Sequence, residues 1–374
     1  MRHPARRLLP LLTAAVLSSY PAAGAAEPGP TAAPTLMRVH FINVGQGAAT
    51  LIELPCGAML VDTGGERSHD FDSDTALSAY LAAFFARRTD LHDTLDLVLL
   101  THPHLDHVRG AGLVLGTYTV HDVVDNGQAG DQEDAIAAVA SVREFVASHP
   151  EVHYLSVATS DLPTDGAPLT SPVLDPFALC RGVDPHVEAL WGRVPGDPGW
   201  GEDDYGKARF DNENNHSIAT RVDFGESSLL ITGDLETVAI RDLLDTREHA
   251  SLDVDIYEVG HHGSDNGTTA QLVEAMSPEW AVMEVGPYDR KASWTAWAYG
   301  HPRATTVDLL EAGVSGQRTA VEEEVATGTR TFTTEEVGRA VYATGWDGAL
   351  VLDADANGSI SLSTPDVIQP AREP

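Results

Sequence analysis

The feature that most constrains this chain is a cluster of metal-binding residue types between His102 and His107. Histidines stand at positions 102, 104 and 107 and an aspartate at 106, directly after the apolar run Leu95–Leu100. A short and nearly continuous apolar run is typical of a strand that is buried on both faces. We therefore predict that the cluster lies on a loop where a central strand ends, so that its side chains can converge.

The residue types in this cluster indicate the ligand they take. Imidazole and carboxylate suit Zn²⁺ best, with Mn²⁺ or Fe as alternatives. His102 and His104 can share one ion, while Asp106 and His107 turn toward a second ion. A single histidine is more often a hydrogen-bonded core residue than a ligand, but four candidate ligands in six positions are rarely explained that way. The sequence therefore predicts two divalent metal ions.

Further ligand types stand at the ends of other predicted strands. The predicted strand 228–232 leads into Asp234 on a glycine turn, where a carboxylate can bridge two cations. The predicted strand 254–259 leads into His261 and His262 between two glycines, and His216 precedes the predicted strand 217–224. Sites in α/β enzymes are built where strands end at one edge of a sheet. These residues are therefore candidates for the same site.

The remaining pattern predicts strands at 38–44, 48–54, 58–61 and 280–285, and helices at 74–88, capped by Asp74, and 131–148. From 126 to 215 the pattern weakens, and we predict an irregular insertion that forms a wall of the substrate pocket, with Trp191, Trp200 and Tyr205 as candidate contacts. Residues 349–352 and 359–362 predict a β-hairpin. A calcium loop there would need a glutamate where Thr364 stands.

The first residues have the pattern of an export signal: three arginines, an apolar run at Leu8–Leu17 and the small residues Ala23-Gly24-Ala25. We predict a signal peptide at 1–26 and a secreted protein, extracellular or periplasmic, with an uncleaved N-terminal anchor as the alternative. We further predict a flexible leader at 27–36, one domain at 37–363 and a disordered tail at 364–374. No other apolar run predicts a membrane span. Export would place Cys56 and Cys180 in an oxidising compartment, where we expect a disulfide.

The acidic composition limits the class of partner. The chain has 56 acidic against 23 basic residues and a net charge of −33. Such a surface repels phosphate backbones at long range, so we expect no high-affinity nonspecific nucleic-acid binding. The composition does not specify an oligomeric state.

Several motifs together resemble a known family. Thr101-His-Pro-His-Leu-Asp-His107, with Asp62-Thr-Gly-Gly65 before it and Thr232-Gly-Asp234 after it, resembles the metallo-β-lactamase superfamily. The segments 41–47, 214–218, 259–264 and 299–302 resemble the soluble hydrolase domain of ComEC-type competence (DNA-uptake) proteins. The resemblance runs in order from about residue 38 to 310. It implies an α/β fold, the αββα sandwich of two mixed β-sheets with helices on the outer faces.

The resemblance also implies roles for individual residues. It implies seven metal ligands: His102, His104 and His216 on the first ion, Asp106, His107 and His262 on the second, and Asp234 on both. His301 competes with His262 for the last position and is otherwise a proton donor or a substrate contact. Asp106 is also the implied proton acceptor, so Asp106 and His301 are the candidate catalytic residues.

The implied activity is that of a secreted, dinuclear metal-dependent hydrolase whose nucleophile is a metal-bridging hydroxide. A phosphodiester, in a nucleic acid or in a small or cell-wall-linked molecule, is the first expected substrate, because the ions restore positive charge in an acidic protein. A lactone or β-lactam on the same centre is one alternative. A non-catalytic, metal-stabilised extracellular binding protein is the other. Glu258 stands where DNA-uptake relatives often carry lysine, and no transmembrane channel is predicted; both features weaken a role in DNA uptake without affecting the hydrolytic core.

Overall fold

The computed structural model describes residues 35–178, 180–201 and 209–363. Its larger β-sheet has eight strands in the order β16-β15-β1-β2-β3-β4-β5-β6. The strands from β16 to β3 are antiparallel neighbours, whereas β3, β4, β5 and β6 run parallel. Their bounds are β1 Leu36–Phe41, β2 Thr50–Leu54, β3 Gly57–Val61, β4 Thr94–Leu99, β5 Thr119–Asp125, β6 His153–Ser156, β15 Leu350–Asp355 and β16 Ile360–Ser363.

A second sheet has six strands in the order β14-β11-β10-β9-β8-β7. Strands β9, β10, β11 and β14 are parallel, and β7, β8 and β9 are antiparallel. Their bounds are β7 Pro185–Ala189, β8 Thr220–Phe224, β9 Ser227–Ile231, β10 Ile256–Glu258, β11 Trp280–Met283 and β14 Val341–Ala343. Both sheets are therefore mixed, as predicted.

The helices connect these strands. The α-helices are α1 Ser73–Arg87, α2 Leu105–Val108, α3 Ala111–Thr117, α4 Glu133–Ser148, α5 Thr237–Thr246, α6 Ala270–Met276, α7 Ala296–Tyr299, α8 Ala304–Gly313 and α9 Thr344–Asp347. Short 3₁₀ turns lie at Thr89–Leu91, Thr159–Asp161, Arg209–Asp211, Glu213–His216, His249–Ser251 and Gly260–Gly263. The predicted cap of α1 was wrong by two residues: Asp72, not Asp74, accepts a hydrogen bond from the Thr75 N–H at 2.9 Å.

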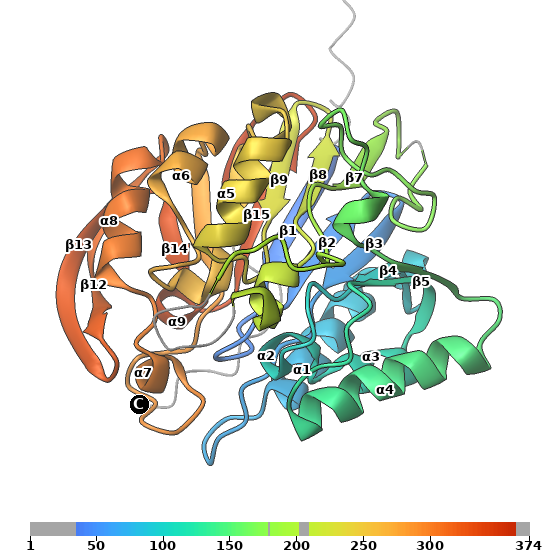
Figure 1. Ribbon diagram of the computed structural model, residues 1–374, viewed down its shortest axis with the longest axis horizontal. Helices are drawn as coiled ribbons and strands as arrows, with labels where there is room; N and C mark the ends of the chain where they lie inside the picture. Colours follow the sequence, from blue (N-terminus) through green and yellow to red (C-terminus); the bar gives the residue numbers. More distant parts are fainter. Residues whose placement is uncertain (1–34, 179, 202–208, 364–374) are drawn as a thin grey trace, which may run out of the picture. The chain divides into compact units, whose positions relative to one another are not determined.

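Two apolar cores hold the layers together. In one core, Leu51, Leu60 and Val98 of the larger sheet pack with residues of α1, α3 and α4, such as Phe84. In the other core, the opposite face of the larger sheet packs with the second sheet, and residues of α5, α6 and α8 join it, including Leu243. Figure 1 shows these two helical layers on opposite sides of the paired sheets. The predicted αββα sandwich is therefore confirmed.

The segment 126–215 was predicted to be an irregular insertion, but much of it is regular structure that belongs to the sandwich. It supplies α4, the edge strand β6 of the larger sheet and the edge strand β7 of the second sheet. Trp191 lies in the core and donates a hydrogen bond from Nε1 to the Asn215 carbonyl at 3.1 Å. Trp200 donates to Asp242 at 2.8 Å. Tyr205 lies outside the described residues.

Several elements were not predicted from the sequence, among them strands β5 and β14, helices α5, α6 and α8, and one two-stranded hairpin. Strands β12 (Gln317–Gly328) and β13 (Thr331–Arg339) form a separate two-stranded hairpin, whose side chains are mostly exposed or half-buried. The expected hairpin of β15 and β16, in contrast, forms as predicted.

The predicted disulfide between Cys56 and Cys180 is confirmed, with Cα atoms 5.1 Å apart. It joins the β2–β3 turn of the larger sheet to the segment before β7 of the second sheet. The predicted signal peptide (1–26) and tail (364–374), and the predicted leader up to residue 34, lie outside the described residues. Within the described ranges, no helix has the length and apolar character that crossing a membrane requires.

Candidate metal centre

The predicted ligands meet where strands of both sheets end. β4 of the larger sheet ends at Leu99, and the following loop carries His102 and His104 to the start of α2. β9 of the second sheet ends at Ile231, three residues before Asp234. The neighbouring strand β10 leads into the 3₁₀ turn that contains His262. The two sheets therefore contribute ligands to one place.

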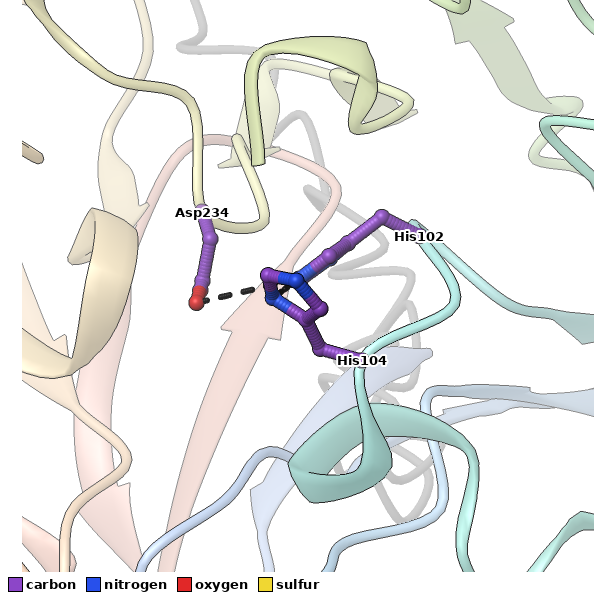
Figure 2. A group of neighbouring side chains, drawn as sticks. All are labelled: His102, His104 and Asp234. Carbon is purple, nitrogen blue, oxygen red and sulfur yellow. Dashed lines mark hydrogen bonds and ion pairs between the residues drawn. The ribbon is translucent and has the colours of Figure 1, made fainter. Parts of the chain in front are cut away.

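The first group of ligand types consists of His102, His104 and Asp234. Figure 2 shows the three side chains pointing toward one another from two separate loops. His102 Nε2 lies 3.1 Å from His104 Nδ1 and 3.8 Å from Asp234 Oδ2. These atoms can all contact one cation placed between them.

The second group consists of Asp106, His107 and His262. His262 Nε2 lies 3.2 Å from His107 Nε2 and 3.4 Å from Asp106 Oδ2. Asp234 also reaches this group, with Oδ1 3.2 Å from His107 Nε2 and Oδ2 3.6 Å from His262 Nε2. Asp234 is therefore the carboxylate that the two groups share, as the glycine turn indicated.

Hydrogen bonds outside the groups determine which ring nitrogen faces inward. Asp62 accepts from His107 Nδ1 at 2.6 Å, and the Glu284 carbonyl accepts from His262 Nδ1 at 2.8 Å. Thr101 Oγ1 donates to Asp62 at 2.7 Å, so it accepts from His102 Nδ1 at 3.1 Å. Each of these histidines therefore carries its proton on Nδ1 and directs an Nε2 lone pair inward.

The two groups fit metal ions because their neutral donor atoms need a positive charge between them. With neutral rings, the facing Nε2 atoms of His107 and His262 are both lone-pair atoms, buried and 3.2 Å apart, so a proton or a metal ion has to lie between them. Burial alone would lower the pKa of His107, but the carboxylates of Asp234 and Asp62 outweigh it and raise this pKa well above its usual value. The site therefore attracts positive charge, which metal ions supply.

The backbone is strained at the same place. His261 and His262 both have positive φ angles, 50° and 52°, and Asp62 has φ 57°. Left-handed backbone costs a non-glycine residue about 1 kcal/mol or more and concentrates at functional sites. Here the left-handed backbone at 261–262 turns the His262 side chain back toward the ends of the strands.

The structure does not bring His216 to either group, which corrects the predicted ligand set. Its Nδ1 accepts a hydrogen bond from the Val194 N–H at 3.0 Å, and its Nε2 donates to the Phe210 carbonyl at 2.6 Å. Both ring nitrogens are therefore engaged by backbone atoms. The cause is local: the 3₁₀ turn Glu213–His216 directs the ring toward the backbone of Val194 and Phe210, away from the ends of the strands.

Between the competing histidines, the geometry favours His262 over His301. His301 is not in either group, and its ring lies 6.3 Å from that of His262. Gln46 Nε2 lies 3.4 Å from His301 Nδ1 and can only donate, so the proton of a neutral His301 is on Nε2. Burial, together with the neighbouring histidines, holds the pKa of His301 well below its usual range.

The ligand groups open into a cavity of about 1450 Å³. Asp106, Asp234, His262 and His301 line it. The segment 126–215 lines it through polar residues at the start of α4 and at 209–214, whereas Trp191 and Trp200 do not. A third group of ligand types, His104, Asp131 and Glu213, lies where this segment lines the cavity.

Several residues of the site had no role assigned from the sequence. Asp62 and Gln46 lie in motifs that the resemblance used, but their contacts depend on loops that are far apart in the chain. Glu213 Oε2 lies 3.4 Å from His104 Nε2. Trp294 and Tyr299 line the cavity, and only the pattern Tyr299-Gly-His-Pro302 gave a signal for that segment.

Comparison with known proteins agrees with this geometry. The sequence model of the Metallo-beta-lactamase superfamily matches residues 42–283, more than half of the chain. ComE operon protein 3 of Bacillus subtilis is 24% identical over 287 residues, which cover 73% of this chain and 30% of that protein. Recombination protein 2 of Haemophilus influenzae is 24% identical over 264 residues, covering 71% of this chain and 25% of that protein. The chain thus spans less than a third of the length of these relatives.

Solved structures with the same fold are more distant in sequence. The metallo-beta-lactamase fold protein YhfI from Bacillus subtilis aligns over 88% of this chain and 100% of its own, with a TM-score of 0.40 and 13% identity. The metallo hydrolase Igni18 from Ignicoccus hospitalis aligns over 66% of this chain and 82% of its own, with a TM-score of 0.33 and 10% identity.

Proposed function

This chain belongs to the metallo-β-lactamase superfamily, and we propose that it is a secreted phosphodiesterase that works with two divalent metal ions. One observation carries the proposal: two adjacent groups of ligand atoms share Asp234 and line one large cavity. His102, His104 and Asp234 would hold the first ion, and Asp106, His107, His262 and Asp234 the second. Imidazole and carboxylate donors favour Zn²⁺, with Mn²⁺ or Fe as alternatives.

Bound ions would supply a water of lowered pKa and positive charge next to the phosphorus atom. The protein supplies the remaining steps through two side chains that line the cavity. Asp106, whose side chain is 30% exposed, is placed to accept the proton of the attacking water. His301 carries its proton on Nε2 and can donate a hydrogen bond to a phosphate oxygen or to the leaving group. Because its pKa is depressed, His301 serves as a neutral donor more readily than as a general acid.

Carboxylates outnumber guanidiniums in the lining of the cavity, but two of its arginines offer an anionic substrate a place to bind beside the metal groups. Arg109 and Arg303 line it, and no carboxylate of the described residues forms an ion pair with either guanidinium. The name of one relative, Recombination protein 2, points to a process that involves nucleic acid. Both observations support a phosphodiester over a lactone or a β-lactam.

Secretion is part of the proposal and depends on the N-terminal pattern of residues 1–26. The disulfide of Cys56 and Cys180 supports it, because structural disulfides persist in oxidising compartments. N-terminal sequencing of the protein recovered outside the cytoplasm should start close to Ala26 or Glu27. Protein that retains Met1 and stays in the cytosol would reject secretion.

Metal content and turnover measured together test the enzymatic proposal. We expect the wild type to bind two ions per chain and to hydrolyse bis-p-nitrophenyl phosphate, and a chelator to abolish turnover. Asp234→Asn should lose both ions and at least about 100-fold in turnover, because it removes the charge that two cations share. His216→Gln is the matched control, since this histidine lies outside both ligand groups: it should keep both ions.

Other substrates complete this test. A homoserine lactone and nitrocefin should be hydrolysed slowly or not at all by the same preparation. Faster turnover of either than of the phosphodiester would replace the proposed substrate class. Full activity after exhaustive chelation, or fewer than one tightly bound ion per chain, would overturn the metal centre.

A further inference from the structure

We propose that Trp294 is a stacking platform for a nucleobase, so that the substrate of the proposed phosphodiesterase is a nucleoside phosphodiester. The inference rests on the proposed function and names its substrate class. Trp294 is 62% exposed, the most exposed of the large apolar side chains among the described residues, and it lines the cavity of the metal centre. An exposed indole in the lining of a cavity offers a flat apolar surface on which a planar ring of the substrate can stack.

The loop that presents Trp294 is held firmly. The Arg290 guanidinium lies on the Phe71 ring, 4.1 Å from its centre, and donates to the buried carboxylate of Glu66 at 2.7 Å. Thr295 Oγ1 contacts the carbonyls of Arg290 and Ala292 at 2.9 and 2.8 Å. Trp294 itself has φ 61°, in the left-handed region. An ion pair and a left-handed backbone residue thus hold an exposed indole in one position. This favours a binding role over an accidental exposure.

Planar rings continue from Trp294 to the metal centre. Trp294 and Tyr299 have ring centres 6.2 Å apart at an interplanar angle of 67°. Tyr299 stacks on His301 at 5.7 Å and 21°, and His301 stacks on His262 at 6.3 Å and 27°. His262 belongs to the second ligand group. A nucleic-acid strand whose phosphate is held at the metal ions would therefore have its bases beside these rings. Base stacking on aromatic side chains is the usual way of holding single-stranded nucleic acid.

The side of the cavity that carries these aromatic rings also carries a guanidinium. Arg303 lies beside the rings, donating to the Tyr299 carbonyl at 3.3 Å, and within the described part of the chain its buried Nε has no hydrogen-bond partner. On the side of His104 the wall carries Asp131 and Glu213. The Arg303 guanidinium can pair with a phosphate oxygen on the side of the rings, which places the nucleoside next to the cleaved bond toward Trp294.

Three substrates with one leaving group test this assignment. They are p-nitrophenyl phosphodiesters whose second alcohol is methanol, glucose or thymidine. In the wild type, kcat/KM for the thymidine ester should exceed that for the methyl ester. Trp294→Ala should lower this ratio about 10-fold, within the roughly 5- to 150-fold range expected of one stacked base. Trp294→Phe should restore most of the ratio.

Tyr288→Ala is the matched control. Tyr288 belongs to the same loop and is 41% exposed, but it packs against Phe332 and does not line the cavity. It should leave the ratio of the thymidine to the methyl ester unchanged. An unchanged ratio in Trp294→Ala would overturn the proposal. So would a selective loss on the glucose ester, which would assign the platform to a sugar.

Binding separates this proposal from the proposed function. Isothermal titration calorimetry should show that the wild-type protein binds thymidine 5′-monophosphate and that Trp294→Ala binds it about 10-fold more weakly. If the wild type hydrolyses none of the esters, the phosphodiesterase assignment fails, but a Trp294-dependent affinity for this nucleotide still supports the platform. Equal affinity of the wild type and the variant would reject the platform, whatever the activity.

Discussion

At the scale of single residues, the ligand histidines depend on neighbours that occupy their other ring nitrogen. Asp62 is the most connected of these neighbours. Besides accepting from His107 Nδ1, its Oδ1 accepts from the Thr101 N–H at 2.8 Å, at the beginning of the loop that carries the first ligands. One carboxylate therefore orients His107 and holds this loop at the end of β3.

Asp62→Ala should lower metal affinity about 10- to 100-fold, because His107 loses the group that sets its tautomer and orientation. Competition with a chelating dye near pH 7.5 measures the affinity. Asp70→Ala is the control, since the Asp70 side chain is 77% exposed and pairs with the exposed His69 rather than with a ligand histidine. Equal loss in both variants, or no loss in Asp62→Ala, would contradict the orienting role.

At the scale of elements, the site requires a close approach between the loop after β3 and helix α2. The Thr63 N–H donates to the His107 carbonyl at 2.7 Å, and the Ala48 N–H donates to the Asp106 carbonyl at 3.0 Å. Gly65 allows this approach because a Cβ there would overlap the Asp106 backbone. The motif 62–65 therefore has two roles: Asp62 orients a ligand histidine, and Gly65 lets α2 approach the loop.

Gly65→Ala should push α2 away from the loop and lower the free energy of unfolding by about 1–3 kcal/mol, with loss of the second metal ion. Urea unfolding and metal analysis of the same sample measure both effects. Gly116→Ala, on the exposed face of α3 where a Cβ meets no atom within 4 Å, should be neutral or stabilising by up to about 1 kcal/mol. Retention of both ions in Gly65→Ala would show that α2 has room to move.

A second contact between elements joins β2 to the end of α1. Glu53 is buried and accepts hydrogen bonds from Arg87 Nη1 at 3.0 Å and Arg88 Nη1 at 2.8 Å, while His40 Nε2 lies 3.1 Å away. Burial would raise the pKa of Glu53, but His40 and the arginines outweigh it and hold this pKa well below its usual value. A depressed folded pKa adds stability above the unfolded value near ~4.3, and this stability is lost as the pH falls below it.

Glu53→Gln should therefore lower the free energy of unfolding by about 3 kcal/mol at pH 7, since it leaves the half-buried Arg87 and Arg88 without their buried carboxylate. The difference from the wild type should shrink progressively below pH ~4. Denaturant unfolding at several pH values measures it. Asp353→Asn, whose partner Arg38 is about one-third exposed, is the control and should cost at most about 1 kcal/mol. A difference that does not change with pH would reject the assignment.

At the scale of the whole sandwich, the disulfide connects the two sheets across 124 residues of sequence. A crosslink that closes a long loop restricts the unfolded chain, with a contribution of about 2–5 kcal/mol. The Cys56→Ser, Cys180→Ser double variant should lose that amount in urea unfolding while keeping two metal ions, because neither cysteine lies in a ligand group. Thiol titration of the unreduced, denatured wild type should find no free thiol. Two free thiols would contradict the crosslink.

The sequence alone determined the local elements and the residue types of the site. Apolar runs such as 95–100, the histidine cluster after them and the carboxylate of Asp234 are local signals, because strand burial and ligand chemistry depend on neighbouring residues. The hairpin of β12 and β13 was missed because its strands are largely exposed, so the hydrophobic alternation is weak. The cap of α1 differed by two residues because Asp72 and Asp74 have equal chemistry and only the backbone geometry separates them.

Only the tertiary structure decided which candidates meet. His216 and His262 look equivalent in the sequence, yet backbone groups engage both nitrogens of His216, while the strained turn at 261–262 brings His262 into the cluster. Asp62 reaches His107 across 45 residues, and Arg290 reaches Glu66 across 224. Trp294 gains its place at the cavity from that second contact. Such contacts depend on how the two sheets pack and on where their loops end. No local pattern of residues encodes which distant side chains will meet.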